Sequence, residues 1–274
     1  MRVLLAQMTP EPGDVAANEA ALAAALEESA GIDLAVFPEL FLEGYDPAFC
    51  REAARPAAEA LAPVSRAAAR AGTAVAVGFA ERLGPGEAAN SVGLVDADGE
   101  IAAVYRKTQL SGPIERESFT PGREYAVARL AGRAVAPLNC FDVEFPEPAR
   151  AVARAGAELL VTVSANMAPY AAEQRLAVRA RALENRLPHV YVNRSGAEGG
   201  NRFVGGSCVV DVFGEVRAEA DPGDLAAEAA PRALVCEVPL GERAAPDVDF
   251  LKHIREPLPV QRSYDNTAKG NQHE

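Results

Sequence analysis

Three polar residues of different chemistry follow strand-like segments of the sequence. Glu39 comes after the apolar run DLAVFP, Lys107 after EIAAVYR, and Cys140 after RAVAPLN. In α/β sheets, ligands gather at the carboxyl ends of strands, so we expect these three side chains to converge on one pocket. The spacing therefore predicts a site that combines a carboxylate, an ammonium group and a thiol.

These residue types suit nucleophilic attack on an amide carbonyl. A free thiol titrates near ~8.5, and a neighbouring carboxylate can accept its proton as the attack proceeds. An ammonium group neutralises the oxyanion that forms, and the backbone N–H of Phe141 is a candidate second donor. Glu115, in the segment SGPIERESF, is a fourth candidate that would orient Lys107 or hold the leaving amine or the attacking water.

Each of the three residues also has a simpler interpretation. Glu39 would be a surface acid, Lys107 a solvated charge at a strand end, and Cys140 a small buried hydrophobe, as most free cysteines are. Short motifs of this kind have low specificity, so spacing alone favours the simpler interpretation.

The elements expected around these residues alternate between strand and helix. Short apolar runs indicate strands, and longer Ala- and Glu-rich stretches indicate helices. The predicted strands are 2–8, 33–38, 74–80, 90–95, 100–106, 126–130, 134–139, 158–164, 189–193, 207–212 and 233–238, and the predicted helices are 16–29, 47–71 with an interruption near Pro56, 147–156 and 171–186. This alternation, with hairpins, favours an α/β fold with helices on the outer faces of the sheet.

The bulk composition limits the expected partners and location. The chain has 274 residues and a formal net charge of −12, and an acidic surface disfavours nucleic acid and anionic membranes because both are polyanions. The N-terminus does not resemble a signal peptide, and no apolar stretch approaches the ~20 residues of a membrane span, so a cytoplasmic location is expected. The four cysteines and three histidines are widely spread, without disulfide or metal-ligand spacing, so no metal is expected.

The sequence is expected to form a single domain. No internal repeat or linker-like run divides it, so residues 1–274 are expected to form one domain. The segment from about residue 250 is polar, contains Pro and has no clear core face. We expect that tail either to lie in an oligomer interface or to be mobile.

Three segments of the chain resemble the signature blocks of the nitrilase, or carbon–nitrogen hydrolase, superfamily. They are PEL at 38–40, YRKTQL at 105–110 and NCFDVEFPE at 139–147, in the order and at the spacing of that family. The similarity extends over nearly the whole chain. It is closest to the bacterial aliphatic amidase branch, which includes 5-aminopentanamidase and stereoselective carboxamide amidases.

The resemblance implies a fold, an assembly and a set of roles. The fold is a four-layer αββα sandwich, and the assembly is a homodimer or larger homo-oligomer formed through the helical layer near the nucleophile. Glu39 would be the general base, Lys107 the stabiliser of the tetrahedral intermediate, Cys140 the acyl-forming nucleophile and Glu115 a supporting glutamate. No cofactor is implied. The expected reaction is hydrolysis of a small aliphatic carboxamide to a carboxylic acid and ammonia through a thioester at Cys140.

Alternative functions stay open at this point. Hydrolysis of an N-carbamoyl amino acid or a carbamoyl-polyamine would use the same residues and release carbon dioxide along with ammonia. Nitrile hydrolysis ranks lower, because the similarity is to amidases. A catalytically silent binding protein on the same fold is the non-enzymatic alternative, although all four family positions are intact.

Several positions depart from the family pattern. Gln109 stands where the family commonly has His, Asn139 replaces an apolar residue, and Phe141 replaces Tyr. Pro137 removes a ladder donor from the strand before the nucleophile. These departures bear on the substrate more than on the reaction class. The candidates for substrate contact, each equally compatible with a core or interface role, are Tyr45, Phe145, Asn166, Met167 and Tyr170.

Overall fold

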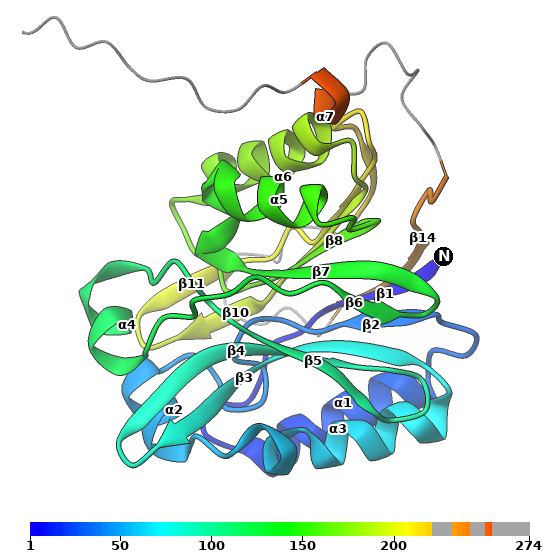
Figure 1. Ribbon diagram of the computed structural model, residues 1–274. Coiled ribbons are helices and arrows are strands. Elements are labelled where there is room, and N and C mark those ends of the chain that lie inside the picture. The colour runs from blue at the N-terminus through cyan, green and yellow to red at the C-terminus, as the bar shows by residue number, and fades with distance from the viewer. Residues whose placement is uncertain (221–231, 242–249, 254–274) are drawn as a thin grey trace, which may run out of the picture.

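Parallel strands joined by helical crossovers form the centre of the first of two sheets. The computed structural model describes residues 1–220, 232–241 and 250–253. In these residues the first sheet has the strand order β14–β1–β2–β3–β4–β5 (Figure 1). Neighbouring strands among β1, β2 and β3 are parallel, whereas β14, β4 and β5 pair antiparallel with their neighbours. The strands are β1 (Arg2–Gln7), β2 (Leu34–Val36), β3 (Ala74–Gly84), β4 (Glu87–Val95), β5 (Ile101–Arg106) and β14 (Arg232–Glu237).

The second sheet repeats this design, with β7, β8 and β9 as its parallel centre. Its order is β13–β12–β9–β8–β7–β6, and the outer pairs are antiparallel. A separate two-stranded hairpin follows β9. The strands are β6 (Ala128–Leu130), β7 (Arg133–Asn139), β8 (Leu159–Ser164), β9 (His189–Asn193), β12 (Cys208–Val210) and β13 (Val216–Glu219), and the hairpin is β10 (Ser195–Glu198) with β11 (Asn201–Val204).

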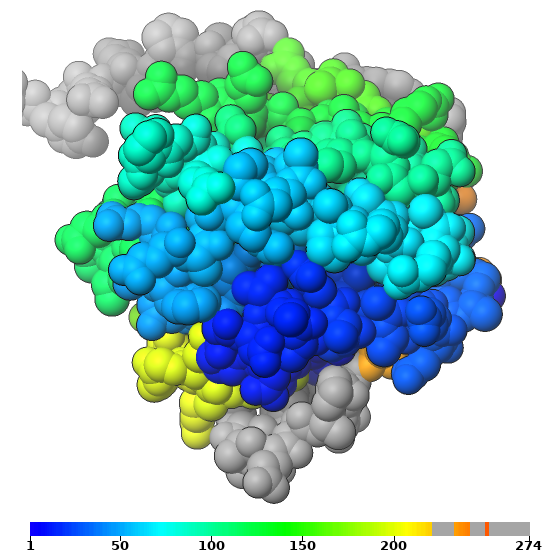
Figure 2. All heavy atoms as spheres, turned by 90° about the horizontal axis from the view of Figure 1, so that it is seen from below, coloured from blue at the N-terminus to red at the C-terminus, as the bar shows by residue number. Residues whose placement is uncertain are grey.

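Helices cover the outer face of each sheet. α1 (Val15–Glu27) and α3 (Ala57–Ala71) pack on the first sheet, and α5 (Pro146–Arg154) and α6 (Ala171–Asn185) pack on the second (Figure 1). Figure 2 views the molecule from the side of α1 and α3, where the N-terminal part of the chain, coloured blue to cyan, covers the surface. The four-layer αββα sandwich expected from the sequence is therefore confirmed. The short helices are α2 (Pro47–Ala53), α4 (Gly112–Ser118) and α7 (Phe250–His253).

Three apolar layers hold the sandwich together. Between the sheets, side chains such as Leu5 and Val36 meet Val161 and Val190 from the opposite sheet. The two outer layers join each sheet to its helices. Because both faces of the central strands are covered, these strands carry continuous apolar runs, and burial of each Val or Leu side chain contributes about 1.5–3 kcal/mol. Within the described residues, no helix is long and apolar enough to span a membrane.

Several elements differ from the sequence expectations. The predicted interruption near Pro56 is confirmed, since α2 ends at Ala53 and Pro56 caps α3. β3 and β4 are longer than predicted and form an extended antiparallel pair. α4, the β10–β11 hairpin and β13 were not predicted, because these short segments carry little apolar periodicity.

Pro137 is accommodated because of where it lies in β7. The pairing of β6 with β7 ends at Val135, whereas β8 pairs with β7 as far as Asn139. At Pro137 the strand is therefore paired on one flank only, by Val161 of β8. Because β6 does not extend to this position, the absence of an N–H at Pro137 does not cost β6 a hydrogen bond.

Candidate active site

The ends of β2 and β5 bring Glu39 and Lys107 into direct contact. Lys107 Nζ donates to Glu39 Oε1 at 2.7 Å and to Glu115 Oε1, from α4, at 2.8 Å. The three residues are at most 3% exposed. A buried ammonium group held between two buried carboxylates is costly to desolvate and is stable only when it is fully paired.

Asn90 of β4, which the sequence pattern does not indicate, completes this cluster. Its Nδ2 donates to Glu39 Oε1 at 2.7 Å and to Glu115 Oε1 at 2.8 Å. Its Oδ1 accepts from Asn139 Nδ2 at 2.7 Å, which gives the departure at Asn139 a structural role. The remaining carboxylate oxygens accept from backbone N–H groups, Glu39 Oε2 from Ala165 at 2.9 Å and Glu115 Oε2 from Ser111. Such pairing fixes the orientation of both carboxylates.

The charges of the cluster follow from burial and pairing. Burial raises the pKa of Glu39, although the neighbouring ammonium of Lys107 acts in the opposite direction. Burial opposes the charge on Lys107, but the carboxylates of Glu115 and Glu39 outweigh it and hold the pKa of Lys107 well above its ordinary value. Lys107 therefore stays protonated across the physiological pH range.

Cys140 lies next to this cluster, at the first position of a 3₁₀ turn, η1 (Cys140–Glu144), that follows β7. Its backbone adopts a left-handed conformation with φ of +42°, which a non-glycine residue rarely takes and which is common at functional sites. Burial raises the pKa of the Cys140 thiol to about 12, with a further contribution from the Glu39 carboxylate that exceeds the opposing effect of Lys107. The resting Cys140 side chain is thus a neutral thiol, which needs a base to become reactive.

Asp142 fixes the position of the Cys140 turn relative to the end of β5. Its carboxylate accepts hydrogen bonds from Tyr105 Oη at 2.8 Å, Thr108 Oγ1 at 2.8 Å and the Gln109 backbone N–H at 2.9 Å. Gln109 makes this contact through its backbone N–H. The contact is therefore independent of whether the side chain at position 109 is Gln or the His that is common in the family. The buried acid joins the two segments that carry Lys107 and Cys140.

Tyr45 lies beside the cluster and lines a surface cavity of about 470 Å³. Burial, together with the Glu39 carboxylate, raises the pKa of the Tyr45 hydroxyl well above its ordinary value, so the hydroxyl stays protonated. The Tyr45 ring packs edge-on against Phe203 of β11, and its backbone N–H donates to Glu198 Oε1 at 2.8 Å. Ile114, the neighbour of Glu115, lines the same cavity. The cavity wall thus includes a residue that precedes Glu115 in the sequence, whereas Glu39, Lys107 and Cys140 are not among its lining residues.

The remaining candidates for substrate contact lie in different surroundings. The rings of Phe141 and Phe145 pack edge-on with centroids 5.1 Å apart. Asn166 is buried, and its backbone N–H donates to Asn193 Oδ1 at 2.7 Å. Met167 forms a β-bridge with Phe203. Tyr170 stands at the start of α6 with 53% of its surface exposed.

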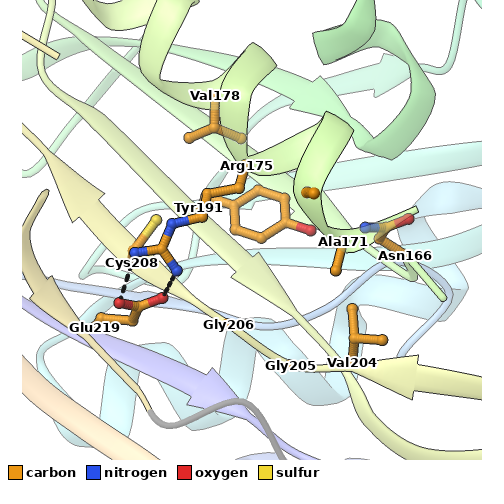
Figure 3. Close-up of a pocket in the computed structure, with 11 residues that line it drawn as sticks. Asn166, Ala171, Arg175, Val178, Tyr191, Val204, Gly205, Gly206, Cys208 and Glu219 are labelled. Atoms are coloured by element: carbon orange, nitrogen blue, oxygen red, sulfur yellow. Dashed lines mark hydrogen bonds and ion pairs between the residues drawn. The ribbon is translucent and has the colours of Figure 1, made fainter. Parts of the chain in front are cut away.

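A second cavity of about 350 Å³ lies beneath the first turns of α6 (Figure 3). Tyr191 of β9 forms part of its wall, and its hydroxyl points toward Asn166 and Ala171. An ion pair between Arg175 and Glu219 lies on the other side of the cavity. The lining is mainly apolar, so this cavity lacks the charged groups of the Cys140 site.

Glu43 is a buried acid between β2 and α2, and burial raises its pKa to about 8. Its Oε2 accepts from the Ala80 N–H at 2.9 Å. A carboxyl with a raised pKa in the folded state favours folding at low pH, so its contribution is full below ~4.5 and is lost as the pH rises toward 8. We expect Glu43→Gln to raise the free energy of unfolding at pH 8.5, by on the order of a few kcal/mol, with a much smaller effect at pH 5.

Urea unfolding at the two pH values tests this prediction for Glu43. Glu52→Gln is the matched control, because Glu52 is an exposed residue of α2. Stability curves of the wild type and Glu43→Gln that run parallel from pH 5 to pH 8.5 would show that another group causes the pH dependence.

The comparisons with known proteins identify the family to which this architecture and site belong. The family model of carbon–nitrogen hydrolases matches residues 2–229. The chain therefore belongs to the carbon–nitrogen hydrolase family. It is a hydrolase that acts on carbon–nitrogen bonds other than peptide bonds, and it has the fold of the nitrilase-superfamily amidases.

Individual relatives are amidases. An (R)-stereoselective amidase from a Pseudomonas species is 39% identical over 261 residues, which cover 93% of this chain and 92% of the relative. A mutant of the amidase from Nesterenkonia sp. AN1 in complex with butyramide is 33% identical, with a TM-score of 0.80 over 93% of this chain and 94% of that one. Another mutant of the same amidase carries acrylamide added to its active-site cysteine, with a TM-score of 0.80, 33% identity, and coverage of 93% and 96%.

Proposed function

We propose that the protein hydrolyses a small aliphatic carboxamide to a carboxylic acid and ammonia, with Cys140 as nucleophile, Glu39 as general base and Lys107 as oxyanion stabiliser. The observation that carries the proposal is the buried Glu39–Lys107–Glu115 cluster, with both contacts of Lys107 Nζ below 3 Å, next to the thiol of Cys140. A purely structural role would not require this desolvated charge cluster beside a strained cysteine.

Acylation begins with the neutral thiol. The Glu39 carboxylate accepts the thiol proton as the sulfur attacks the amide carbon, so a C–S bond forms and the carbonyl π electrons move to the oxygen. Lys107 and the Phe141 N–H stabilise that oxyanion. When the carbonyl re-forms, the C–N bond breaks, Glu39 delivers its proton to the nitrogen, and ammonia leaves a thioester on Cys140.

Deacylation uses the same groups in reverse roles. Glu39, again a carboxylate, removes a proton from water as the water oxygen attacks the thioester carbon. The second tetrahedral intermediate collapses with cleavage of the C–S bond, and the sulfur recovers a proton from Glu39. Glu115 supports both halves, because it fixes Lys107 through a 2.8 Å contact and shares Asn90 with Glu39.

The substrate class rests on the relatives and on the cavity beside Tyr45. The Nesterenkonia amidase mutant binds butyramide, a short aliphatic amide, and the Pseudomonas relative is a stereoselective amidase. Tyr45, Phe49 and Ile114 give the wall of the 470 Å³ cavity apolar surface that suits an aliphatic acyl chain.

An ammonia-release screen across aliphatic amides, N-carbamoyl amino acids, carbamoyl-polyamines and nitriles tests the proposal. We expect turnover of short monoamides with ammonia and the acid as products. Release of carbon dioxide together with ammonia would identify a carbamoyl hydrolase instead. Acid production from nitriles with inert amides would overturn the amide assignment, and a lack of turnover across all four classes would favour a binding protein.

The exposed face of α6 supports a homodimer. Leu176 and Leu183 lie seven residues apart, about two helical turns, with 69% and 39% of their surfaces exposed. Adjacent apolar side chains on an exposed helix face are typical of interfaces. We expect the wild type to sediment as a dimer at micromolar concentration and Leu176→Glu to shift it to monomer. Ile101→Glu, an exposed apolar residue of β5, should leave the dimer intact, and a Leu176→Glu variant that remains dimeric would exclude this face.

We also propose a cytoplasmic location. All four cysteines of the sequence lie in the described residues and are unpaired thiols, three of them buried. Unpaired thiols fit a reducing compartment.

A further inference from the structure

Two side chains outside the catalytic cluster contact the sulfur of Cys140. Ser164, the last residue of β8, has its Oγ 3.3 Å from Cys140 Sγ and 3.1 Å from Gln174 Oε1, and Gln174 Nε2 of α6 lies 3.7 Å from the same sulfur. Both residues are at most 1% exposed. A polar side chain is costly to bury unless its hydrogen bonds are made. The contacts with the sulfur are therefore part of the hydrogen bonding that compensates for burial of Ser164 and Gln174.

Tyr191 fixes the orientation of the Gln174 amide. Its hydroxyl donates to Gln174 Oε1 at 2.5 Å and also lies 3.1 Å from Ser164 Oγ. Because the amide oxygen accepts the tyrosine proton, the amide NH₂ is the group that faces the sulfur. The reversed amide would set its NH₂ against the tyrosine hydroxyl and an acceptor against the sulfur.

The positions of the three residues in the fold make this arrangement rigid. Ser164 and Tyr191 lie on the adjacent parallel strands β8 and β9, and Gln174 comes from the helix that covers them. Tyr191 packs in the apolar layer between the second sheet and α6, together with Val178. The donors therefore approach the sulfur from the helix side, while Glu39 and Lys107 come from the ends of strands in the first sheet.

We propose that Gln174 and Ser164 are positioning residues that hold the Cys140 sulfur by hydrogen bonds, with Tyr191 locking the Gln174 amide in the donating orientation. This inference rests on the proposed role of Cys140 as nucleophile. Two donors on the sulfur stabilise negative charge as the thiol proton moves to Glu39, and they occupy two lone-pair directions so that a third points to the amide carbon. They lose their charged acceptor once the thioester forms, so they favour the attacking state over the acylated one.

The pH dependence of thiol alkylation measures this effect without any amide turnover. Iodoacetamide modification of Cys140, followed by mass spectrometry of its peptide, gives a rate at each pH. We expect Gln174→Met and Ser164→Ala each to lower that rate about tenfold at a fixed pH and to move the profile to higher pH, because the thiolate has lost a donor. Gln174→Glu keeps the shape of the side chain and should lower the rate further, since it sets a carboxylate against the thiolate.

Tyr191→Phe and Thr162→Val separate positioning from packing. Tyr191→Phe keeps the ring and frees the Gln174 amide to rotate, so we expect a smaller loss than in Gln174→Met. Thr162 is a buried residue of β8 whose Oγ1 pairs with His189 Nε2 at 2.7 Å. Thr162→Val removes a hydroxyl from the same strand and should lower the melting temperature with no change in the alkylation profile.

The outcomes divide clearly between the two proposals. If the folded Gln174→Met, Gln174→Glu and Ser164→Ala proteins keep the wild-type alkylation profile, the positioning role is wrong even when Cys140 is the nucleophile. If kcat/KM falls about tenfold in Gln174→Met with little change in KM, and alkylation falls in parallel, the role is supported. If Cys140→Ala still turns over amides, the proposed function fails, whereas the alkylation results still report on the sulfur contacts.

Discussion

Cys140→Ala is expected to lower amide turnover by more than about 10⁴-fold while the protein stays folded. Without the sulfur no thioester can form, and loss of a nucleophile that acts together with its base typically removes nearly all of the catalysed rate. The substitution deletes one buried atom from a residue that is only 9% exposed, so its cost in stability is small compared with the loss of activity. Ammonia release under saturating amide, with thermal unfolding followed by circular dichroism, measures both effects.

Cys208→Ala is the matched control for this experiment. Cys208 lies on β12, is also buried, and burial raises its pKa to about 12, as it does for Cys140. A general effect of losing a buried thiol would therefore appear in both variants. Wild-type turnover in Cys208→Ala and none in Cys140→Ala would assign the chemistry to one thiol, and persistent turnover in Cys140→Ala would refute the assignment.

The strand-end rule explains how much of the candidate site could be predicted from the sequence. Glu39 and Cys140 follow strands in the parallel centres of the two sheets. Lys107 follows β5, which is two antiparallel steps from β3 and therefore ends at the same edge of its sheet. The same rule applied to ELLVTVS would have found Ser164, since this residue ends β8. A serine at a strand end carries weaker chemistry than a carboxylate, an ammonium group or a thiol, so the pattern alone does not single it out.

Other parts of the site had no local signal. Asn90 is a polar residue inside a buried run of β4, and its role depends on which carboxylates lie opposite it in the folded chain. Gln174 sits on a helix whose apolar periodicity is weak, so its burial could not be read from the pattern. The β10–β11 hairpin places Glu198 and Phe203 against Tyr45, but its short strands carry little apolar alternation, so the sequence does not predict it. Residues whose roles depend on contacts between distant parts of the chain leave no local sequence signal, so only the folded structure identifies them.

Lys107→Met is expected to lower kcat by about 10³-fold or more. Methionine preserves most of the length and volume of the side chain but removes the charge, and loss of one oxyanion donor typically costs about 2.7–4 kcal/mol of barrier. A second effect acts in the same direction. Without the ammonium group the pKa of Glu39 rises further, because Lys107 is the main influence that opposes burial. A larger share of Glu39 is then protonated at neutral pH and cannot serve as a base.

The same substitution is expected to make stability depend more steeply on pH. Removing one partner of a buried ion pair typically costs about 3–5 kcal/mol when the remaining charge stays in place. The buried Glu39 carboxyl can avoid this cost by taking up a proton, so its contribution to folding is retained at low pH and lost as the pH rises through its raised pKa. The melting temperature of Lys107→Met should therefore fall further below that of the wild type at pH 8.5 than at pH 5.

A double variant separates the catalytic role of Lys107 from its structural role. Glu115→Gln added to Lys107→Met removes one of the two carboxylates that lost their cation, and the glutamine keeps an oxygen that can accept from Asn90 Nδ2 as Glu115 does at 2.8 Å. The double variant should regain stability at pH 8.5 relative to Lys107→Met, because less negative charge remains buried. It should not regain turnover, because no cation faces the oxyanion. Near-normal kcat in Lys107→Met, or recovery of turnover together with stability, would show that Lys107 serves the fold and that another group stabilises the oxyanion.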